Sequence, residues 1–144
     1  WTKDFPKIDY EIRLEAMRAG GSDFFCGLTF PVNDSHASLI LGGWGGTVCG
    51  ISCLDGEDAA NNETTTSTNF KNGVWYPIRL RVTKNKLEAW LQNEQIVDAD
   101  TKDREIGVRI EVEESRPLGL ATFQTTAALR NISWRKLTAG GGKN

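Results

Sequence analysis

Residues 8–18 read IDYEIRLEAMR, and in this stretch hydrophobic and charged side chains alternate one by one. Side chains of a β-strand point to opposite faces in turn, so the alternation is typical of a strand with one buried and one solvated face. The buried face is predicted to carry Ile8, Tyr10, Ile12, Leu14 and Ala16, and the solvated face Asp9, Glu11, Arg13 and Glu15.

The same period of two recurs along the chain, most clearly over residues 78–83 and 106–113. Further strands are predicted over residues 24–30, 38–41, 48–53, 87–91, 118–123 and 129–137. A sustained helical period of 3.6 is found nowhere, although residues 55–62 and 101–105 could each hold one helical turn. About nine or ten short strands at near-regular spacing predict an all-β antiparallel sandwich or barrel.

The composition indicates one folded domain. Of 144 residues, 39% are hydrophobic and 25% charged, as in ordinary globular domains. We expect this domain to span residues 1–138 and to be cut from a larger protein, with residues 139–144 as a flexible tail. The net charge is −2 without a basic cluster, so nucleic acid is not an expected partner. No hydrophobic stretch approaches the roughly 20 residues of a membrane span.

Five segments together carry the pattern of a known family. They are residues 9–15 (DYEIRLE), 73–82 (GVWYPIRLRV), 87–97 (LEAWLQNEQIV), 117–121 (PLGLA) and 128–137 (ALRNISWRKL). The pattern resembles the 3-keto-disaccharide hydrolase domain family, which has the concanavalin A-like lectin/glucanase fold. The resemblance implies a jelly-roll β-sandwich of two antiparallel sheets and an activity on 3-keto-glycosides.

The chain departs from this family pattern where typical members place polar groups on a concave face. Residues 21–31 read GSDFFCGLTFP and residues 38–42 read SLILG, which are mostly hydrophobic. We therefore rank a carbohydrate-recognition or accessory domain, or a structural module packing against neighbouring chains, ahead of a 3-keto-glycoside hydrolase or lyase. The catalytic residues of such an enzyme stay unassigned.

Two tryptophans are candidates for sugar contact, because sugar C–H groups stack on aromatic rings. Trp90 shares its predicted strand face with Glu88 and Gln92. Trp44 lies in the glycine-rich residues 42–46, which predict a hairpin loop, since a phosphate loop would lead into a helix. In the alternative interpretation, each tryptophan is covered by other parts of the protein and contacts no sugar.

Glycoside hydrolysis usually needs two carboxyl groups about 5–9.5 Å apart. They would come from different strands, with Asp23, Glu88, Glu111 and Glu113 as candidates and solvated charges as the alternative. His36, the single histidine, is a candidate general base. We keep Asp23 and His36 among the candidate ligand-binding residues.

The loop after residue 54 gathers acidic side chains. Asp55, Asp58 and Glu63 are candidate calcium ligands, because calcium prefers carboxylate oxygens. Their spacing fits no calcium-loop template, and such residues are also common in ordinary loops. We expect no cofactor, with calcium as the alternative.

The cysteines do not indicate a compartment. Cys49 and Cys53 would lie about 13 Å apart on an extended strand, too far for a disulfide. Cys26 could pair with either, but we expect buried free thiols in the core. An extracytoplasmic location is expected because domains of the resembled family are commonly exported.

The last predicted strand is expected to lie unpaired at a sheet edge. Jelly rolls of this type usually pair an N-terminal strand with the C-terminal one, and this chain offers few residues for it. An open edge invites another strand, so we expect a covering segment, a protein partner or a second copy to add to it. The alternative is an exposed edge kept soluble by Arg130, Arg135 and Lys136.

Overall fold

The computed structural model describes residues 5–108 and 115–137. Within them the named elements are all β-strands, and every strand pairing is antiparallel. The predicted all-β class is therefore confirmed. The two segments considered for helical turns, 55–62 and 101–105, form turns, bends and isolated bridges instead.

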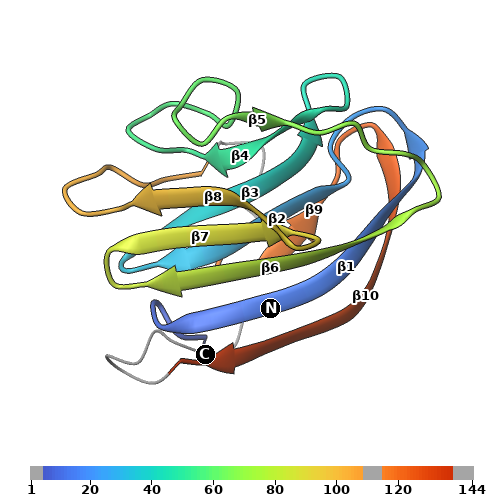
Figure 1. Ribbon diagram of the computed structural model, residues 1–144. Coiled ribbons are helices and arrows are strands. Elements are labelled where there is room, and N and C mark those ends of the chain that lie inside the picture. Colours follow the sequence, from blue (N-terminus) through green and yellow to red (C-terminus); the bar gives the residue numbers. More distant parts are fainter. Residues whose placement is uncertain (1–4, 109–114, 138–144) are drawn as a thin grey trace.

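Two five-stranded sheets stack face to face (Figure 1). The first sheet has the order β10 (Thr125–Lys136), β1 (Tyr10–Gly21), β6 (Trp75–Thr83), β7 (Lys86–Leu91) and β8 (Glu94–Asp100). The second has the order β5 (Thr66–Ser67), β4 (Val48–Ser52), β3 (Ser35–Gly43), β2 (Cys26–Val32) and β9 (Gly119–Ala121). This arrangement agrees with the jelly-roll sandwich that the resemblance implies.

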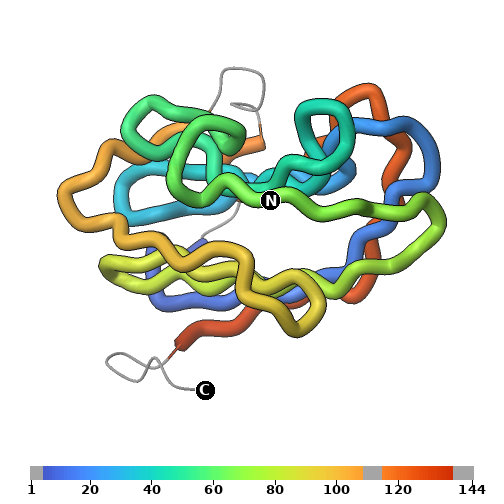
Figure 2. The backbone as a smooth tube through the Cα atoms, turned by 45° about the horizontal axis from the view of Figure 1, so that its top comes forward, coloured from blue at the N-terminus to red at the C-terminus, as the bar shows by residue number. Residues whose placement is uncertain are grey.

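The core lies between the two layers, which Figure 2 shows from a second direction. Strand β1 buries Tyr10, Ile12, Leu14 and Ala16, as its alternation predicts. The Tyr10 hydroxyl donates a hydrogen bond to the backbone oxygen of Pro31 at 2.5 Å and so links the two sheets. Since one face of β1 is sealed in the core, its other side chains are fixed on the opposite face of the first sheet.

Three segments differ from the predicted strands, and one of them is the two-residue strand β5, which was not predicted. Strand β8 was not predicted, because only Val97 and Ala99 of its residues are buried. In the segment predicted as a strand over 106–113, Ile106 forms a single bridge with Leu54. Residues 109–114, which include the candidates Glu111 and Glu113, lie outside the described residues, as does the predicted tail at 139–144.

The last strand is paired on one side, which corrects the expectation that it has no N-terminal partner. Strand β10 pairs with β1 from Tyr10↔Lys136 to Gly21↔Thr125. Among the described residues no strand lies on its other side, so β10 is an edge of the first sheet. Leu129, Ile132 and Trp134 on this edge are 37%, 56% and 39% exposed.

Candidate functional site

Strand register aligns side chains in rows across the outer face, which is the face of the first sheet turned away from the second. One row, here called the ion-pair row, contains Arg135, Glu11, Arg81 and Glu88 as successive cross-strand neighbours. Positive and negative side chains alternate along it. Opposite charges directly across a strand pair stabilise a sheet, so this row is explained by the stability of the fold.

The carboxylate of Glu11 is the centre of the ion-pair row, and its side chain is fully buried beneath arginines. Arg13 donates to it at 2.8 Å, Arg81 at 3.0 Å, and Arg135 lies 3.4 Å away. Burial acts to raise the pKa of Glu11, but the hydrogen bonds from Arg13 and Arg81 and the charge of Arg135 outweigh burial and lower the pKa. Glu11 is therefore a charged structural anchor for the outer face.

The neighbouring row, here called the arginine row, runs Ser133, Arg13, Arg79, Trp90 and Gln95. Its composition is different, because two arginines stand directly opposite each other on β1 and β6 with no acidic residue in the row. The Arg79 guanidinium lies 4.0 Å from the centre of the Trp90 ring. That face of the indole is thus covered by a cation rather than by another hydrophobic side chain.

The outer face is hollowed over the arginine row, forming an open depression of about 530 Å³. Its lining includes Arg13, Arg79, Trp90, Gln92, Asn131 and Ser133. Ligand sites usually combine apolar surface with a few convergent polar groups. This depression offers guanidinium, amide and hydroxyl groups around one aromatic ring.

Glu15 is the carboxylate that lines this depression, and it is held in place by β10. It accepts hydrogen bonds from Arg130 at 2.7 Å and from Asn131 at 3.3 Å, which lower its pKa. Arg130 in turn lies 3.9 Å from the Trp75 ring centre. Because Glu15 is ionised at neutral pH, it is suited to accept hydrogen bonds rather than to act as a general acid.

The structure separates the residues that the sequence proposed for ligand binding. Trp90, Glu88 and Gln92 belong to β7 and the turn that follows it, and Trp90 and Gln92 line the depression. Trp44 and Asp23 come together at another place, the hairpin between β3 and β4. There Asp23 accepts a hydrogen bond from the Gly45 amide at 3.3 Å, and Trp44 is 41% exposed.

His36 lies apart from both groups, at the start of β3 beside the turn that joins it to β2. Burial and the positive charges of Arg116 and Lys7 lower its pKa. Among the described residues no carboxylate contacts His36, and His36 does not line the depression. The geometry therefore gives His36 no partner for general-base chemistry at the outer face.

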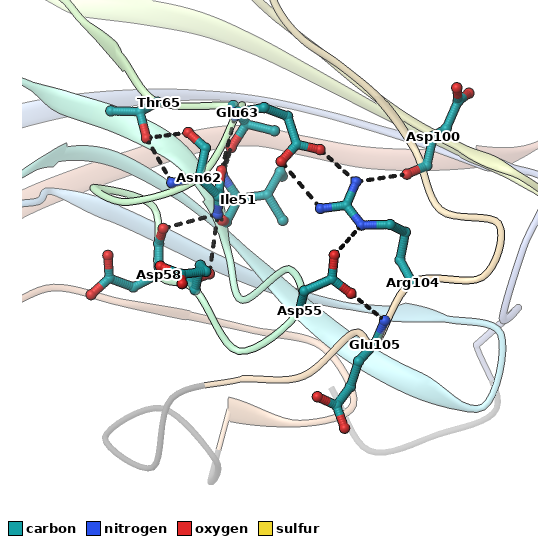
Figure 3. Close-up of polar contacts among 11 residues, drawn as sticks. Ile51, Asp55, Asp58, Asn62, Glu63, Thr65, Asp100, Arg104 and Glu105 are labelled. Atoms are coloured by element: carbon teal, nitrogen blue, oxygen red, sulfur yellow. Dashed lines mark hydrogen bonds and ion pairs between the residues drawn. The ribbon is translucent and has the colours of Figure 1, made fainter.

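The candidate calcium ligands are engaged in protein contacts (Figure 3). Arg104 donates hydrogen bonds to Asp55 and to both carboxylate oxygens of Glu63. Asp58 accepts hydrogen bonds from the Ala60 amide and from Asn61. Within the described residues no group of three His, Cys, Asp or Glu side chains is placed to hold a metal.

The three cysteines are free thiols, with Cys26 and Cys49 buried and Cys53 half-buried. Burial raises the pKa of Cys26 to about 12. Burial also raises the pKa of Cys49. These two thiols therefore behave as small core side chains, which agrees with the expectation of buried free thiols.

Sequence reasoning missed Arg13, Arg79, Asn131 and Ser133 as site residues. The alternation of β1 and β6 did place both arginines on a solvated face, and that was the available signal. The sequence does not show that residues 13, 79, 90 and 133 share one row, because this depends on the register between distant strands.

The described residues contain no helix long and apolar enough to cross a membrane. A comparison with curated proteins finds no match. Residues 5–135 match the family described as the 3-keto-alpha-glucoside-1,2-lyase-like domain. This match agrees with the family resemblance of the five sequence segments and with the fold, and because it spans most of the chain, the protein belongs to this carbohydrate-related family of β-sandwich domains.

Proposed function

We propose that the chain is a carbohydrate-recognition domain that binds a glycan in the depression on the outer face. The observation that carries the proposal is the grouping of Trp90 with Gln92, Asn131 and Ser133 around one open hollow. Amide and hydroxyl side chains both donate and accept hydrogen bonds, which suits the hydroxyl groups of a sugar. Membership in a carbohydrate-related family supports the same conclusion.

The geometry modifies the role expected for Trp90. Because Arg79 covers one face of the indole at 4.0 Å, a sugar ring stacks there only if the guanidinium moves away. In the proposed complex Trp90 instead supports Arg79, and the exposed Pro77 adds apolar surface to the depression. Hydrogen bonding thus contributes more to recognition than ring stacking does.

Binding to a glycan array, followed by titration calorimetry with the glycans that bind, tests the proposal. Trp90→Ala removes the support of Arg79 and is expected to weaken binding by about tenfold or more, which corresponds to about 1.4 kcal/mol. Trp44→Ala changes a tryptophan at the β3–β4 hairpin and serves as the matched control. If Trp44→Ala abolishes binding and Trp90→Ala does not, the site is at the hairpin and the proposal is wrong.

A second candidate function is catalysis, which the family description favours. The chain would then cleave 3-keto-glycosides in the same depression. Against this, the pKa values of Glu11, Glu15, Asp55 and Glu63 are all lowered, so these four carboxyl groups are not suited to act as general acids. Incubating the chain with a 3-keto-disaccharide and measuring released sugar distinguishes catalysis from recognition. Turnover would place catalysis ahead of recognition.

A third candidate function is assembly, favoured by the exposed hydrophobic side chains on the edge strand β10. A protein partner or a second copy of the chain would add a strand beside β10. Light scattering combined with amide exchange over residues 128–137 tests this candidate. A monomer with fast exchange along β10 would leave the charged edge as the explanation for its solubility.

We further propose that the domain works outside the cytoplasm as an accessory part of a larger protein. Its support is the carbohydrate-related family, because glycans are abundant outside cells. Cell fractionation with an antibody against the domain tests the location. Recovery in the cytoplasmic fraction would contradict it.

A further inference from the structure

The distribution of charge on the outer face indicates what kind of glycan the depression takes. Strands β10, β1 and β6 place five arginines and two glutamates on this face, although the whole chain has a net charge of −2. The arginines are Arg13, Arg79, Arg81, Arg130 and Arg135, and the glutamates are Glu11 and Glu15. Strands β7 and β8 add Lys86, Glu88, Asp98 and Asp100 to the same face, so the positive excess is local to strands β10, β1 and β6.

Most of these arginines form ion pairs with carboxylates beside them, which explains their presence on this face. Arg81 and Arg135 reach Glu11, and Arg130 reaches Glu15. Arg79 differs from them, because its contact in the described structure is with the Trp90 ring, and no carboxylate lies within ion-pair distance of it. Within the described residues, the hydrogen-bond donors of its guanidinium are thus left for a ligand.

Arg13 stands directly across from Arg79 and is only partly engaged. Its Nε donates to Glu11 at 2.8 Å, and its side chain is 58% exposed. The two terminal nitrogens have no hydrogen-bond partner among the described residues. Like charges directly opposite each other destabilise a strand pair, so the placement of Arg13 across from Arg79 does not itself stabilise the fold.

The chemistry of the two side chains fits a negatively charged group. A guanidinium presents its donors in a rigid fork that matches the two oxygens of a carboxylate or sulfate. Stacking on Trp90 holds the Arg79 fork in place before a ligand arrives. An anion above the arginine row would also remove the repulsion between Arg79 and Arg13.

We infer that the glycan bound in this depression is anionic and that Arg79, with Arg13 beside it, holds its carboxylate or sulfate group. The inference rests on the proposed carbohydrate-recognition function and specifies its ligand class. Ser133 and Asn131, which also line the depression, are placed to contact hydroxyl groups of the same sugar.

Matched pairs of oligosaccharides test the inference on the intact chain. Uronate oligosaccharides are compared with their methyl-esterified forms, and sulfated oligosaccharides with their desulfated forms, by titration calorimetry. We expect the anionic member of a pair to bind at least about tenfold more tightly, as expected for a hydrogen bond to a charged group. The two kinds of pair show whether carboxylate or sulfate is preferred. Added salt should weaken only the anionic ligand's binding.

Arg79→Gln is expected to lower affinity for the anionic oligosaccharide by about tenfold and to leave affinity for the neutral one nearly unchanged. Lys71→Gln, which removes one positive charge from an exposed position away from this row, is the control and should change neither. Arg79→Lys keeps the charge without the fork and should have an intermediate effect.

The outcomes separate the inference from the function on which it rests. Equal binding of both members of every pair would overturn the anionic preference and leave carbohydrate recognition standing. A preference that persists in a folded Arg79→Gln variant would overturn the assignment to Arg79. Failure to bind any oligosaccharide of either kind would overturn both the inference and the proposed function.

Discussion

Replacing Glu11 by Gln tests how the outer face is held together. The substitution keeps the size of the side chain but removes the single charge that accepts hydrogen bonds from Arg13, Arg81 and Arg135. Arg13 and Arg135 are 58% and 45% exposed, so they can turn into solvent at little cost. Arg81 is only 13% exposed and remains beside the neutral amide.

The expected loss therefore comes mainly from Arg81. A hydrogen bond to a charged group contributes about 1.5–3 kcal/mol, and the amide of Gln retains one acceptor oxygen, so we expect a loss of about 2 kcal/mol. For a chain of 144 residues, this corresponds to a fall in Tm of roughly 6–8 °C. Thermal melting and urea unfolding at neutral pH both measure it.

The pH dependence gives a second check of the same reasoning. The folded pKa of Glu11 is lowered, so its stabilisation is present above the unfolded pKa of about 4.3 and is lost as the pH falls through the folded pKa. The stability difference between wild type and Glu11→Gln should therefore shrink in acid.

A second glutamate-to-glutamine substitution serves as the control for Glu11→Gln. Glu94→Gln, at the exposed first residue of β8, should change stability by less than about 0.5 kcal/mol. Neutral replacements of buried ion pairs are sometimes harmless. A Glu11→Gln variant as stable as wild type would be such a case, and it would refute the anchoring role of Glu11. A stability difference that stays constant from neutral to acid pH would refute its electrostatic origin.

Three further predictions concern the rest of the fold. Replacing the buried Arg18 by Met leaves carbonyl oxygens of two loops without their donor, and urea unfolding should show a loss of about 2–4 kcal/mol; an unchanged midpoint would contradict this. Alkylation of the native chain at mildly alkaline pH should modify the half-buried Cys53 before Cys26, whose pKa burial raises to about 12, as mass spectrometry would show; early labelling of Cys26 would contradict its burial. Gly21→Ala places a Cβ 2.6 Å from the Gln124 backbone oxygen at a φ of +90°, so thermal melting should show a loss of about 1–3 kcal/mol; a fully stable variant would show that the turn can rearrange.

The sequence predicted the strands with regular alternation and missed two, the two-residue β5 and the weakly alternating β8. Strands β1 and β6 seal one face in the core, so their hydrophobic residues recur at every second position. Strand β8 lies at the other edge of the first sheet, where few of its side chains are covered. Its mostly polar sequence therefore gives little signal of a strand.

The candidate site was predicted in part for the same physical reason. Alternation placed Trp90 on a solvated face with Glu88, but it could not say which strands lie beside β7. Arg13 and Arg79 become neighbours through pairing between β1 and β6, and Arg79 meets Trp90 through pairing with β7. Register between distant strands is set by packing of the whole core, which local pattern does not contain.

The calcium prediction shows the same limit. The acidic loop residues are close in sequence, but Arg104, which binds two of them, is 49 residues from Asp55 and 41 from Glu63. The cluster of acidic residues in the sequence therefore indicated negative charge at that loop. It did not show that Arg104, which is distant in sequence, compensates this charge.

The central claim is that a glycan binds on the outer face of the first sheet, and NMR titration tests it most directly. An anionic oligosaccharide from the matched pairs is added to the ¹⁵N-labelled chain, and the indole signals of Trp90 and Trp44 are compared. Our account predicts that the Trp90 indole and the backbone amides of Arg79 and Ser133 shift together, whereas the Trp44 indole does not move. Shifts confined to Trp44 and the β3–β4 hairpin would contradict the account and would place the binding site at that hairpin.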